Sequence, residues 1–216
     1  MSEKERLADY LASLEPAADR LLVQIETKAR EDRIPIIRKE TGALLKTLIA
    51  ALQPEQILEV GTAVGYSSLL MANVMPREGH ITTIENYEKR IPIARENFRR
   101  AGMEERITLL EGDAGEIIQN LPKAAYRFIF MDAAKGQYLH WLPRILELLA
   151  PGGILVSDNV LQDGTILESR FAVERRDRTI HRRMREYLYQ LKHRKDLETA
   201  VLPVGDGVTV SVKRAT

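Results

Sequence analysis

The first 53 residues carry apolar side chains at the three- and four-residue spacing of amphipathic helices. Pro35 and Pro54 interrupt this pattern and separate its segments. The spacing predicts a helical N-terminal region with apolar stripes formed by Leu7, Leu11, Leu14, Leu21, Leu22, Ile25, Ala29, Leu44, Leu45, Leu48, Ile49 and Leu52.

From residue 56 the pattern changes to short apolar runs that end in polar residues or glycine, each followed by helical spacing. The runs are QILEVG, HITTIE, RITLLEGD, RFIFMD and GILVSDN. We expect the helices between and after them at about 67–74, 88–101, 114–121 and 137–149. This alternation predicts a parallel sheet with helices on both faces.

The end of the chain predicts one further helix and a β-hairpin. A basic helix at about 172–194 precedes the runs ETAVLPV and GVTVSVK, which are joined through Gly205-Asp206-Gly207. Such a tight connection indicates a hairpin whose second strand is antiparallel to its neighbour in the sheet. The seven runs together predict a Rossmann-like α/β sheet in a single domain over 1–216, with a helical cap at 1–53 and a core at 54–216.

Composition narrows the class of protein and the chemistry that it can use. With 44% hydrophobic and 29% charged residues, the chain has the composition of an ordinary globular protein. It contains no cysteine, which excludes disulfides, thiolate nucleophiles and Cys-based zinc sites, so a metal would need oxygen or imidazole ligands. The N-terminus lacks the apolar segment of a secretory signal, and we expect a cytoplasmic protein.

Positive charge is concentrated in one part of the chain. The net charge is +1, but residues 168–195 carry ten Lys and Arg against four Asp and Glu. That segment therefore has a net charge of +6 and the remainder −5. A basic helix of this kind can bind phosphates, although many proteins that bind no nucleic acid also have one.

A glycine turn follows the first strand. The segment from Gly61 to Ser67 lies between the strand and its helix, where doubly wound sheets bind ligands. The dinucleotide fingerprint G-x-G-x-x-G is incomplete, because Ala63 and Tyr66 stand at its second and third glycine positions. This disfavours NAD and suits a cofactor without a pyrophosphate, such as S-adenosylmethionine. A plain strand-to-helix turn is the alternative.

Two acidic residues follow the next two strands. Glu85 ends the second strand 24 residues after Gly61, where a carboxylate can accept hydrogen bonds from ribose hydroxyls. Asp113 closes the third strand in the sequence GDA, a position suited to adenine, and Ala114 leaves space beside it. Each of these acids alone could be an ordinary surface residue, but with the glycine turn they predict an adenosine site.

Oxygen-bearing side chains also end the fourth and fifth strands. Asp132 follows RFIFM, and Asp158 and Asn159 follow GILVS, so these residues should meet at one edge of the sheet. Two carboxylates and an amide oxygen suit a hard divalent cation and leave positions for water and substrate. The alternative is that Asp132 caps a helix and Asp158 and Asn159 begin a loop. Lys135 lies beside this site as a candidate base for a hydroxyl, or as an exposed loop lysine.

These motifs resemble, over nearly the whole chain, the bacterial metal-dependent O-methyltransferases related to catechol and caffeoyl-CoA methyltransferases. The similar segments are EVGTAVGYSS, Glu85 with GDA, MDAAKGQY and SDNV. The resemblance implies a class I methyltransferase fold, S-adenosylmethionine, Mg²⁺ or Mn²⁺, and a homodimer. It implies metal ligands Asp132, Asp158 and Asn159, catalytic residues Lys135 and Asp132, and cofactor contacts Ile37, Gly61, Thr62, Ser67, Glu85, Asp113, Ala114 and Asp132.

Within that family the chain is similar to the members that methylate 5-hydroxyuridine at the tRNA wobble position to 5-methoxyuridine. The segments concerned are IPIIRKETG, DAAKGQY, DNVLQDG and LPVGDGVTVSVK. The tRNA anticodon loop would then be the partner, bound through Arg175, Arg176, Arg178, Arg182, Arg183 and Arg185. The apolar face of that helix would contain Ile180, Met184, Tyr187 or Leu188, and Leu191.

Three other functions remain open. An O-methyltransferase of small catechol-like or phenylpropanoid substrates would use the same metal chemistry. A nicotinamide-dependent dehydrogenase shares the type of sheet but needs the missing glycines. A non-catalytic RNA-binding module would keep the basic helix without any need for Asp132, Asp158 and Asn159.

Overall fold

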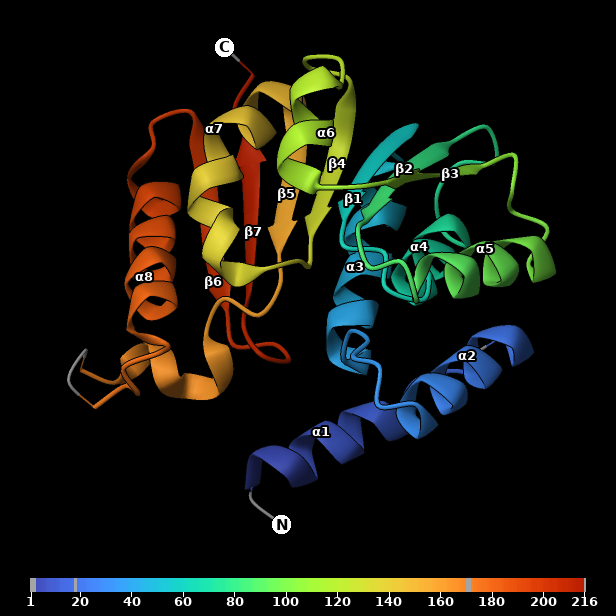
Figure 1. Ribbon diagram of the computed structural model, residues 1–216, viewed down its shortest axis with the longest axis horizontal. Helices are drawn as coiled ribbons and strands as arrows, with labels where there is room; N and C mark the ends of the chain where they lie inside the picture. The colour runs from blue at the N-terminus through green and yellow to red at the C-terminus, as the bar shows by residue number, and fades with distance from the viewer. Residues whose placement is uncertain (1–2, 18, 170–171, 216) are drawn as a thin grey trace.

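The computed structural model describes residues 3–17, 19–169 and 172–215. Seven strands form one sheet in the order β3-β2-β1-β4-β5-β7-β6 (Figure 1). Strands β1 to β5 are parallel, and β7 is antiparallel to both of its neighbours. The strands are β1 (Gln56–Val60), β2 (His80–Glu85), β3 (Ile107–Glu111), β4 (Tyr126–Met131), β5 (Leu149–Ser157), β6 (Leu197–Leu202) and β7 (Val208–Lys213). The predicted fold class is confirmed, including its antiparallel last strand.

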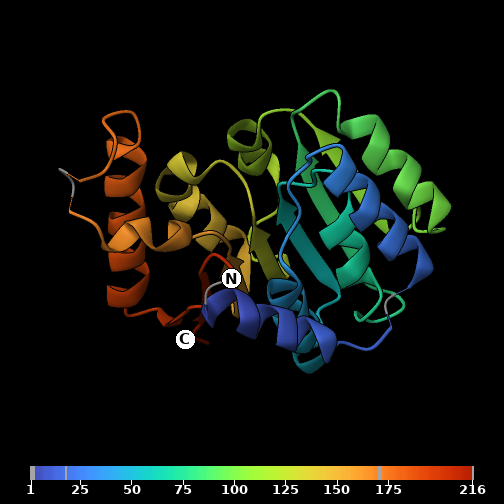
Figure 2. The same ribbon diagram turned by 90° about the horizontal axis from the view of Figure 1, so that it is seen from below.

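Helices cover both faces of the sheet because successive strand residues point to opposite sides. In β4, Phe128 and Phe130 belong to one hydrophobic core and Ile129 and Met131 to the other, and all four are fully buried. Helices α2 to α5 pack on the first core and α6 to α8 on the second (Figure 2). The helices are α1 (Glu3–Ser13), α2 (Arg20–Glu31), α3 (Lys39–Leu52), α4 (Tyr66–Ala72), α5 (Ile91–Arg100), α6 (Ala114–Asn120), α7 (Tyr138–Leu148) and α8 (Arg178–His193), with 3-10 helices η1 (Lys135–Gln137) and η2 (Gln162–Leu167).

The basic helix differs from the expectation in its start and in its buried face. Helix α8 begins at Arg178 rather than near residue 172. Its buried residues are His181, Met184, Tyr187 and Leu191, whereas Ile180 keeps 36% of its surface exposed. The apolar pattern identified most of this face. It missed His181 because a histidine does not register as apolar, although packing between α7 and α8 buries it.

The parallel strands place the predicted residues that follow them at one edge of the sheet, whereas Ile37 lies between α2 and α3 and the predicted arginines lie in or just before α8. Strands β1, β2, β4 and β5 end at Val60, Glu85, Met131 and Ser157, and each is followed directly by a loop that carries candidate residues. The parallel registers keep these ends level. None of the described helices combines the length and the apolar character needed to cross a lipid bilayer.

Candidate active site

A cavity of about 610 Å³ lies at the carboxyl edge of the sheet. Its wall combines the loops after β1 to β5 with the segment between α2 and α3 and the turn between β6 and β7. The predicted residues that line it are Ile37, Gly61, Glu85, Asp113, Ala114, Asp132, Lys135, Asp158 and Asn159. The structure therefore brings the predicted cofactor, metal and base residues together in one space.

Gly61 is required where the ends of β1 and β4 approach each other. Its φ is +108°, and a Cβ atom there would lie 2.0 Å from the backbone oxygen of Asp132. Any side chain would force the two loops apart. The glycine thus sets the distance between the cofactor loop and the first of the predicted metal ligands.

Two predicted cofactor residues, Thr62 and Ser67, lie behind the cavity wall. Both are buried, and the Thr62 hydroxyl pairs with Thr83 at 2.6 Å. Thr83 in turn donates to the fully buried carboxylate of Glu59 at 2.5 Å, and Ser68 donates to the same oxygen. Burial raises the pKa of Glu59 to about 7. These residues support the glycine turn from below by a buried polar network.

Glu85 holds the glycine turn against the end of β2. Its Oε2 accepts a hydrogen bond from the Ala63 N–H at 2.7 Å. Its Oε1 accepts from the N–H groups of Asn86 and Tyr87 at 3.0 and 2.9 Å. Three backbone donors therefore hold the carboxylate in place at the wall of the cavity.

Asp113 also has a local structural role. It is the N-cap of α6, and its Oδ1 accepts a long hydrogen bond of 3.3 Å from the Glu116 N–H. Trp141 of α7 lies over this helix start, with its ring nitrogen 3.0 Å from the position that a Cβ of Gly115 would take. Trp141 and Arg90, which both line the cavity, were missed because their positions look like ordinary helix residues in the sequence.

Asp132, Asp158 and Asn159 meet at the other end of the cavity. The Asn159 side-chain amide donates to Asp132 Oδ1 at 3.0 Å, and the Asn159 backbone N–H donates to Asp158 Oδ1 at 2.7 Å. Asn159 has a φ of +61°, an unusual backbone conformation that turns the chain at this point. Helix η1 has Ala134 at its N-cap position, so the alternative in which Asp132 caps the following helix is wrong.

The two carboxylates disfavour each other's ionised form. Burial, followed by the charge of Asp132, raises the pKa of Asp158 to about 7. Burial also raises the pKa of Asp132, while its hydrogen bond with Asn159 and the charge of Lys135 act in the opposite direction. The charge of Asp206 raises the pKa of both groups further. This end of the cavity concentrates negative charge.

Asp206 reaches the cavity from the β6–β7 turn, which the sequence pattern had indicated only as a hairpin connection. Its carboxylate forms an ion pair of 2.5 Å with Arg38, from the segment that precedes α3. Its backbone oxygen accepts from the Leu161 N–H at 3.1 Å, just beyond Asn159. The position of Asp206 between two glycines with positive φ is the signal that could have marked it as more than a turn residue.

Comparison with known proteins is consistent with this arrangement. The model of an O-methyltransferase family matches residues 14–214. The chain belongs to this family. It is 31% identical over 169 residues to a catechol O-methyltransferase of Niastella koreensis, covering 76% of each chain. It is 30% identical over 184 residues to a caffeoyl-CoA O-methyltransferase of Medicago sativa, covering 79% of this chain and 72% of the relative.

A solved structure extends the likeness to the whole fold. The O-methyltransferase TomG of Streptomyces achromogenes, determined in complex with S-adenosylmethionine, has a TM-score of 0.86 and 26% identity over all of both chains. The chain is therefore an S-adenosylmethionine-dependent O-methyltransferase of the catechol and caffeoyl-CoA type. The dehydrogenase and the non-catalytic RNA-binding module are thereby set aside.

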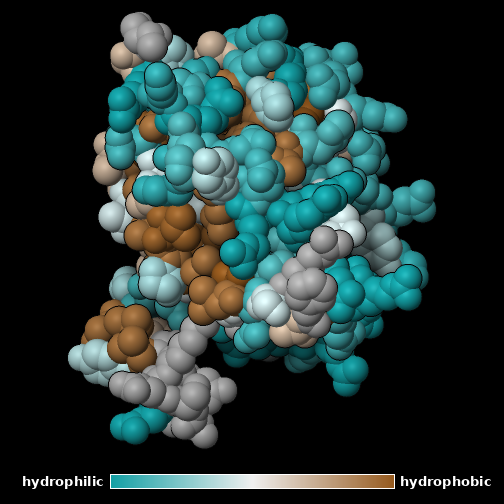
Figure 3. Space-filling model, turned by 90° about the vertical axis from the view of Figure 1, so that its left-hand side faces the viewer, coloured by the Kyte–Doolittle hydropathy of each residue, from teal (hydrophilic) through white to brown (hydrophobic). Residues whose placement is uncertain are grey.

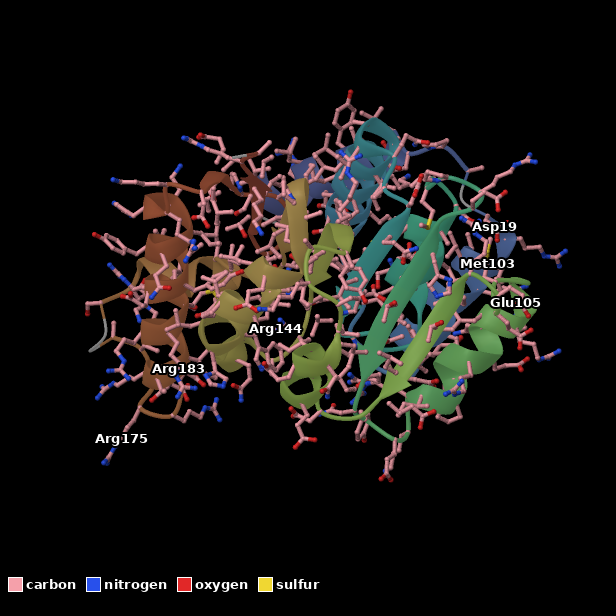
Figure 4. All side chains as sticks on the ribbon, turned by 90° about the horizontal axis from the view of Figure 1, so that it is seen from above. Asp19, Met103, Glu105, Arg144, Arg175 and Arg183 are labelled. Atoms are coloured by element: carbon pink, nitrogen blue, oxygen red, sulfur yellow. The ribbon has the colours of Figure 1, made fainter. Side chains whose placement is uncertain are left out.

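The arginines of the basic segment have unequal surroundings in this O-methyltransferase. Arg178, Arg183 and Arg185 donate to the backbone oxygens of Val173, Gly136 and Ile166. Arg176 pairs with Glu174 and Asp177. Arg175 and Arg182 form no hydrogen bond or ion pair with the residues that the structure describes, and both are exposed. Figure 4 shows Arg175 and Arg183 on the α8 side of the molecule, with Arg175 pointing away from it.

Proposed function

We propose that this O-methyltransferase depends on a divalent cation and methylates 5-hydroxyuridine at the wobble position of tRNA, giving 5-methoxyuridine. The observation that carries the metal dependence is the meeting of Asp132, Asp158 and Asn159 in the same cavity as Gly61 and Glu85. Mg²⁺ or Mn²⁺ is the expected ion, since hard oxygen ligands favour both.

The donor set fits such a cation. The buried Asp158 and the partly buried Asp132 both have raised pKa values, and a divalent cation between their carboxylates would relieve the repulsion between them. Within the described chain no three His, Cys, Asp or Glu side chains form a metal-binding group, so the third protein ligand would be the Asn159 amide oxygen. Asn159 would then present its oxygen rather than its NH₂ group, a change that needs only rotation of the amide.

The remaining cavity residues divide into those that would bind the cofactor and one that would move a proton. Glu85 would hold the ribose, Asp113 and Ala114 the adenine, and Ile37, Gly61 and Asp132 the rest of the cofactor. Thr62 and Ser67 would support the cofactor loop from behind the cavity wall. When bound, S-adenosylmethionine supplies the methyl group and the cation lowers the pKa of the acceptor hydroxyl. Lys135 would accept the proton of that hydroxyl as its oxygen forms the new bond to carbon and the sulfur–carbon bond breaks. Fixing donor and acceptor in line supplies much of the acceleration.

The choice of a tRNA acceptor rests on the sequence likeness and on the basic segment. Arg175 and Arg182 are the residues whose guanidinium groups are best placed to bind phosphates, because the other four already have partners within the chain. An anticodon-loop base is unpaired, so presenting it to the cavity costs less than extraction from a duplex. The second candidate acceptor is a small catechol-like or phenylpropanoid molecule, which the named relatives favour.

The decisive experiment offers both acceptors to the purified enzyme. It would be incubated with S-adenosylmethionine, Mg²⁺ and tRNA from a strain that lacks the modification, and in parallel with a panel of catechols. Mass spectrometry of the tRNA nucleosides should show 5-methoxyuridine, and a chelator should abolish it. Methylation of catechols alone would overturn the tRNA substrate, and full activity in the chelator would overturn the metal dependence.

We also propose that the enzyme is a homodimer. Helix α1 and the residue directly after it present a stripe of side chains that are 43–61% accessible: Leu7, Tyr10, Leu11 and Leu14. Figure 3 shows further apolar surface on the side that carries α8 and the β6 edge of the sheet. A second copy would bury this stripe. Light scattering should give twice the mass of 24.5 kDa, and a monomer at micromolar concentration would contradict the proposal.

A further inference from the structure

Tyr138 occupies the first position of α7 and is fully buried. Its ring packs edge-on against Tyr187 of α8, with centroids 5.5 Å apart and planes at 64°. The aromatic packing accounts for the ring, but a phenylalanine would provide the same packing. The hydroxyl needs a separate explanation.

The Tyr138 hydroxyl lies between the two loops that carry the predicted metal ligands. It accepts a hydrogen bond from the Ala133 N–H at 3.1 Å. It donates toward the backbone oxygens of Met131 at 3.0 Å and Asp158 at 3.3 Å. The hydroxyl thus binds the peptide groups on both sides of Asp132 and the carbonyl of Asp158.

Together with further backbone hydrogen bonds, these contacts fix the distance between the loops that carry the two carboxylates. The Asp158 N–H donates to the same Met131 oxygen at 2.9 Å, and the Asp132 N–H donates to the Val60 oxygen at 2.9 Å. At the end of β5, the Ser157 hydroxyl pairs with the Tyr187 hydroxyl at 2.6 Å. The backbone of Asp132 and Asp158 is therefore held from the sheet on one side and by the Tyr138 hydroxyl on the other, while Tyr187 holds the side chain of the adjacent Ser157.

These hydrogen bonds oppose the repulsion between the Asp132 and Asp158 carboxylates. Asp132 and Asp158 directly follow the paired residues Met131 and Ser157 and line the same cavity, so separation of the two loops would lower the repulsion between their carboxylates. A hydroxyl that binds both loops resists this separation. A cation site binds its ion more tightly when its ligands are held near the coordination distance before the ion arrives.

We propose that the Tyr138 hydroxyl is a positioning residue that holds Asp132 and Asp158 at the spacing required to bind the divalent cation. This inference rests on the proposed metal dependence, which it deepens by naming the side chain that pre-forms the site. It assigns Tyr138 no contact with substrate, cofactor or metal.

The test compares Tyr138→Phe with two matched tyrosine variants. Tyr126→Phe removes a buried hydroxyl at the opposite end of β4, where its partner is Thr82. Tyr187→Phe removes the neighbouring hydroxyl, which contacts Ser157 and neither ligand residue. Mn²⁺ affinity is measured by electron paramagnetic resonance on each folded protein, alongside affinity for S-adenosylmethionine and thermal unfolding.

We expect Tyr138→Phe to bind Mn²⁺ about 10-fold more weakly, as is usual when a group that orients a metal ligand is removed. Its methyl transfer should recover toward the wild-type rate as Mn²⁺ is raised. Tyr126→Phe should keep the wild-type affinity, and Tyr187→Phe should lie between the two. A general loss of stability would not produce this order in proteins that are folded during the measurement.

The possible results distinguish a failure of this inference from a failure of the proposed metal dependence. Equal Mn²⁺ affinity of Tyr138→Phe and the wild type would overturn the inference and leave the metal dependence standing. Equal weakening in Tyr126→Phe would also overturn it, since a buried hydroxyl anywhere would then have the same effect. A wild-type protein that binds no Mn²⁺ would overturn the metal dependence itself, and the inference with it.

Discussion

The carboxylates at the two ends of the cavity have different surroundings. At the end formed by β1 to β3, Glu85 accepts three backbone N–H groups and Asp113 accepts one. At the end formed by β4 and β5, the buried Asp158 and the partly buried Asp132 line the same space, and the pKa values of both are raised. The carboxylates of the first end accept hydrogen bonds from backbone donors, whereas those of the second end have raised pKa values that the neighbouring charge of Lys135 offsets only in part.

This difference indicates what each end requires from its ligand. Glu85 already has donors, so a cofactor ribose adds hydrogen bonds to a finished site. Asp132 and Asp158 gain most from a cation, because it removes a repulsion that the fold leaves in place. The second end is therefore where we propose that the cation binds, on physical grounds that are independent of family likeness.

The largest expected effect comes from removing one carboxylate at the second end. Asp158→Ala should lower methyl transfer at least 100-fold, because the cation loses a direct ligand. The metal-free variant should be at least as stable as the wild type, since the repulsion with Asp132 is gone. Rate assays at saturating S-adenosylmethionine and urea unfolding in a chelator provide the two measurements. Retained activity would place the metal elsewhere or exclude it.

The proposed base is tested next at the same end. Lys135→Met should lower kcat about 100-fold, the usual size for loss of a general base, with cofactor affinity changed little. Raising the pH should recover part of the rate, because the acceptor hydroxyl then ionises without help. A pH profile parallel to that of the wild type would assign Lys135 to binding rather than to proton transfer.

Glu59, which is buried beneath the glycine turn of the first end, allows the effect of burial on the pH dependence of stability to be measured. Its pKa is raised to about 7, so the native state binds its proton more tightly than the unfolded chain does. The stability gained from this proton is complete below about pH 4.5 and is lost as the pH rises through about 7. Between pH 5 and 8 this group should lower the free energy of unfolding of the wild type by about 3 kcal/mol. In Glu59→Gln this decline should be absent. Urea unfolding at several pH values measures it, and parallel curves for both proteins would contradict the assigned pKa.

The smallest expected effect comes from replacing two exposed arginines of the basic segment. The double variant Arg175→Gln, Arg182→Gln should raise KM for tRNA about threefold and reduce the salt dependence of binding by roughly one to two phosphate contacts. Activity toward a catechol, if present, should not change. Arg20→Gln, which alters an exposed arginine at the start of α2, is the matched control. An unchanged salt dependence would remove these two arginines from the proposed RNA surface.

The sequence determined which elements form and which polar residues end the strands. Alternating apolar runs encode burial on both faces, and polar residues directly after them must lie at the carboxyl edge. This logic placed Glu85, Asp113, Asp132 and Asp158 correctly in one cavity. The roles that the resemblance to the family implies, such as that of Lys135 as a base, remain predictions.

Tertiary structure alone decided the features that depend on distant segments. Periodicity reports whether a residue is buried, but it does not report which side chain from another element arrives beside it. The Arg38–Asp206 pair joins segments 168 positions apart, and Arg183 contacts the loop after β4 rather than solvent alone. Tyr138 could be predicted as a buried aromatic residue, yet its hydroxyl contacts with both ligand loops exist only because β4, β5 and α7 pack together.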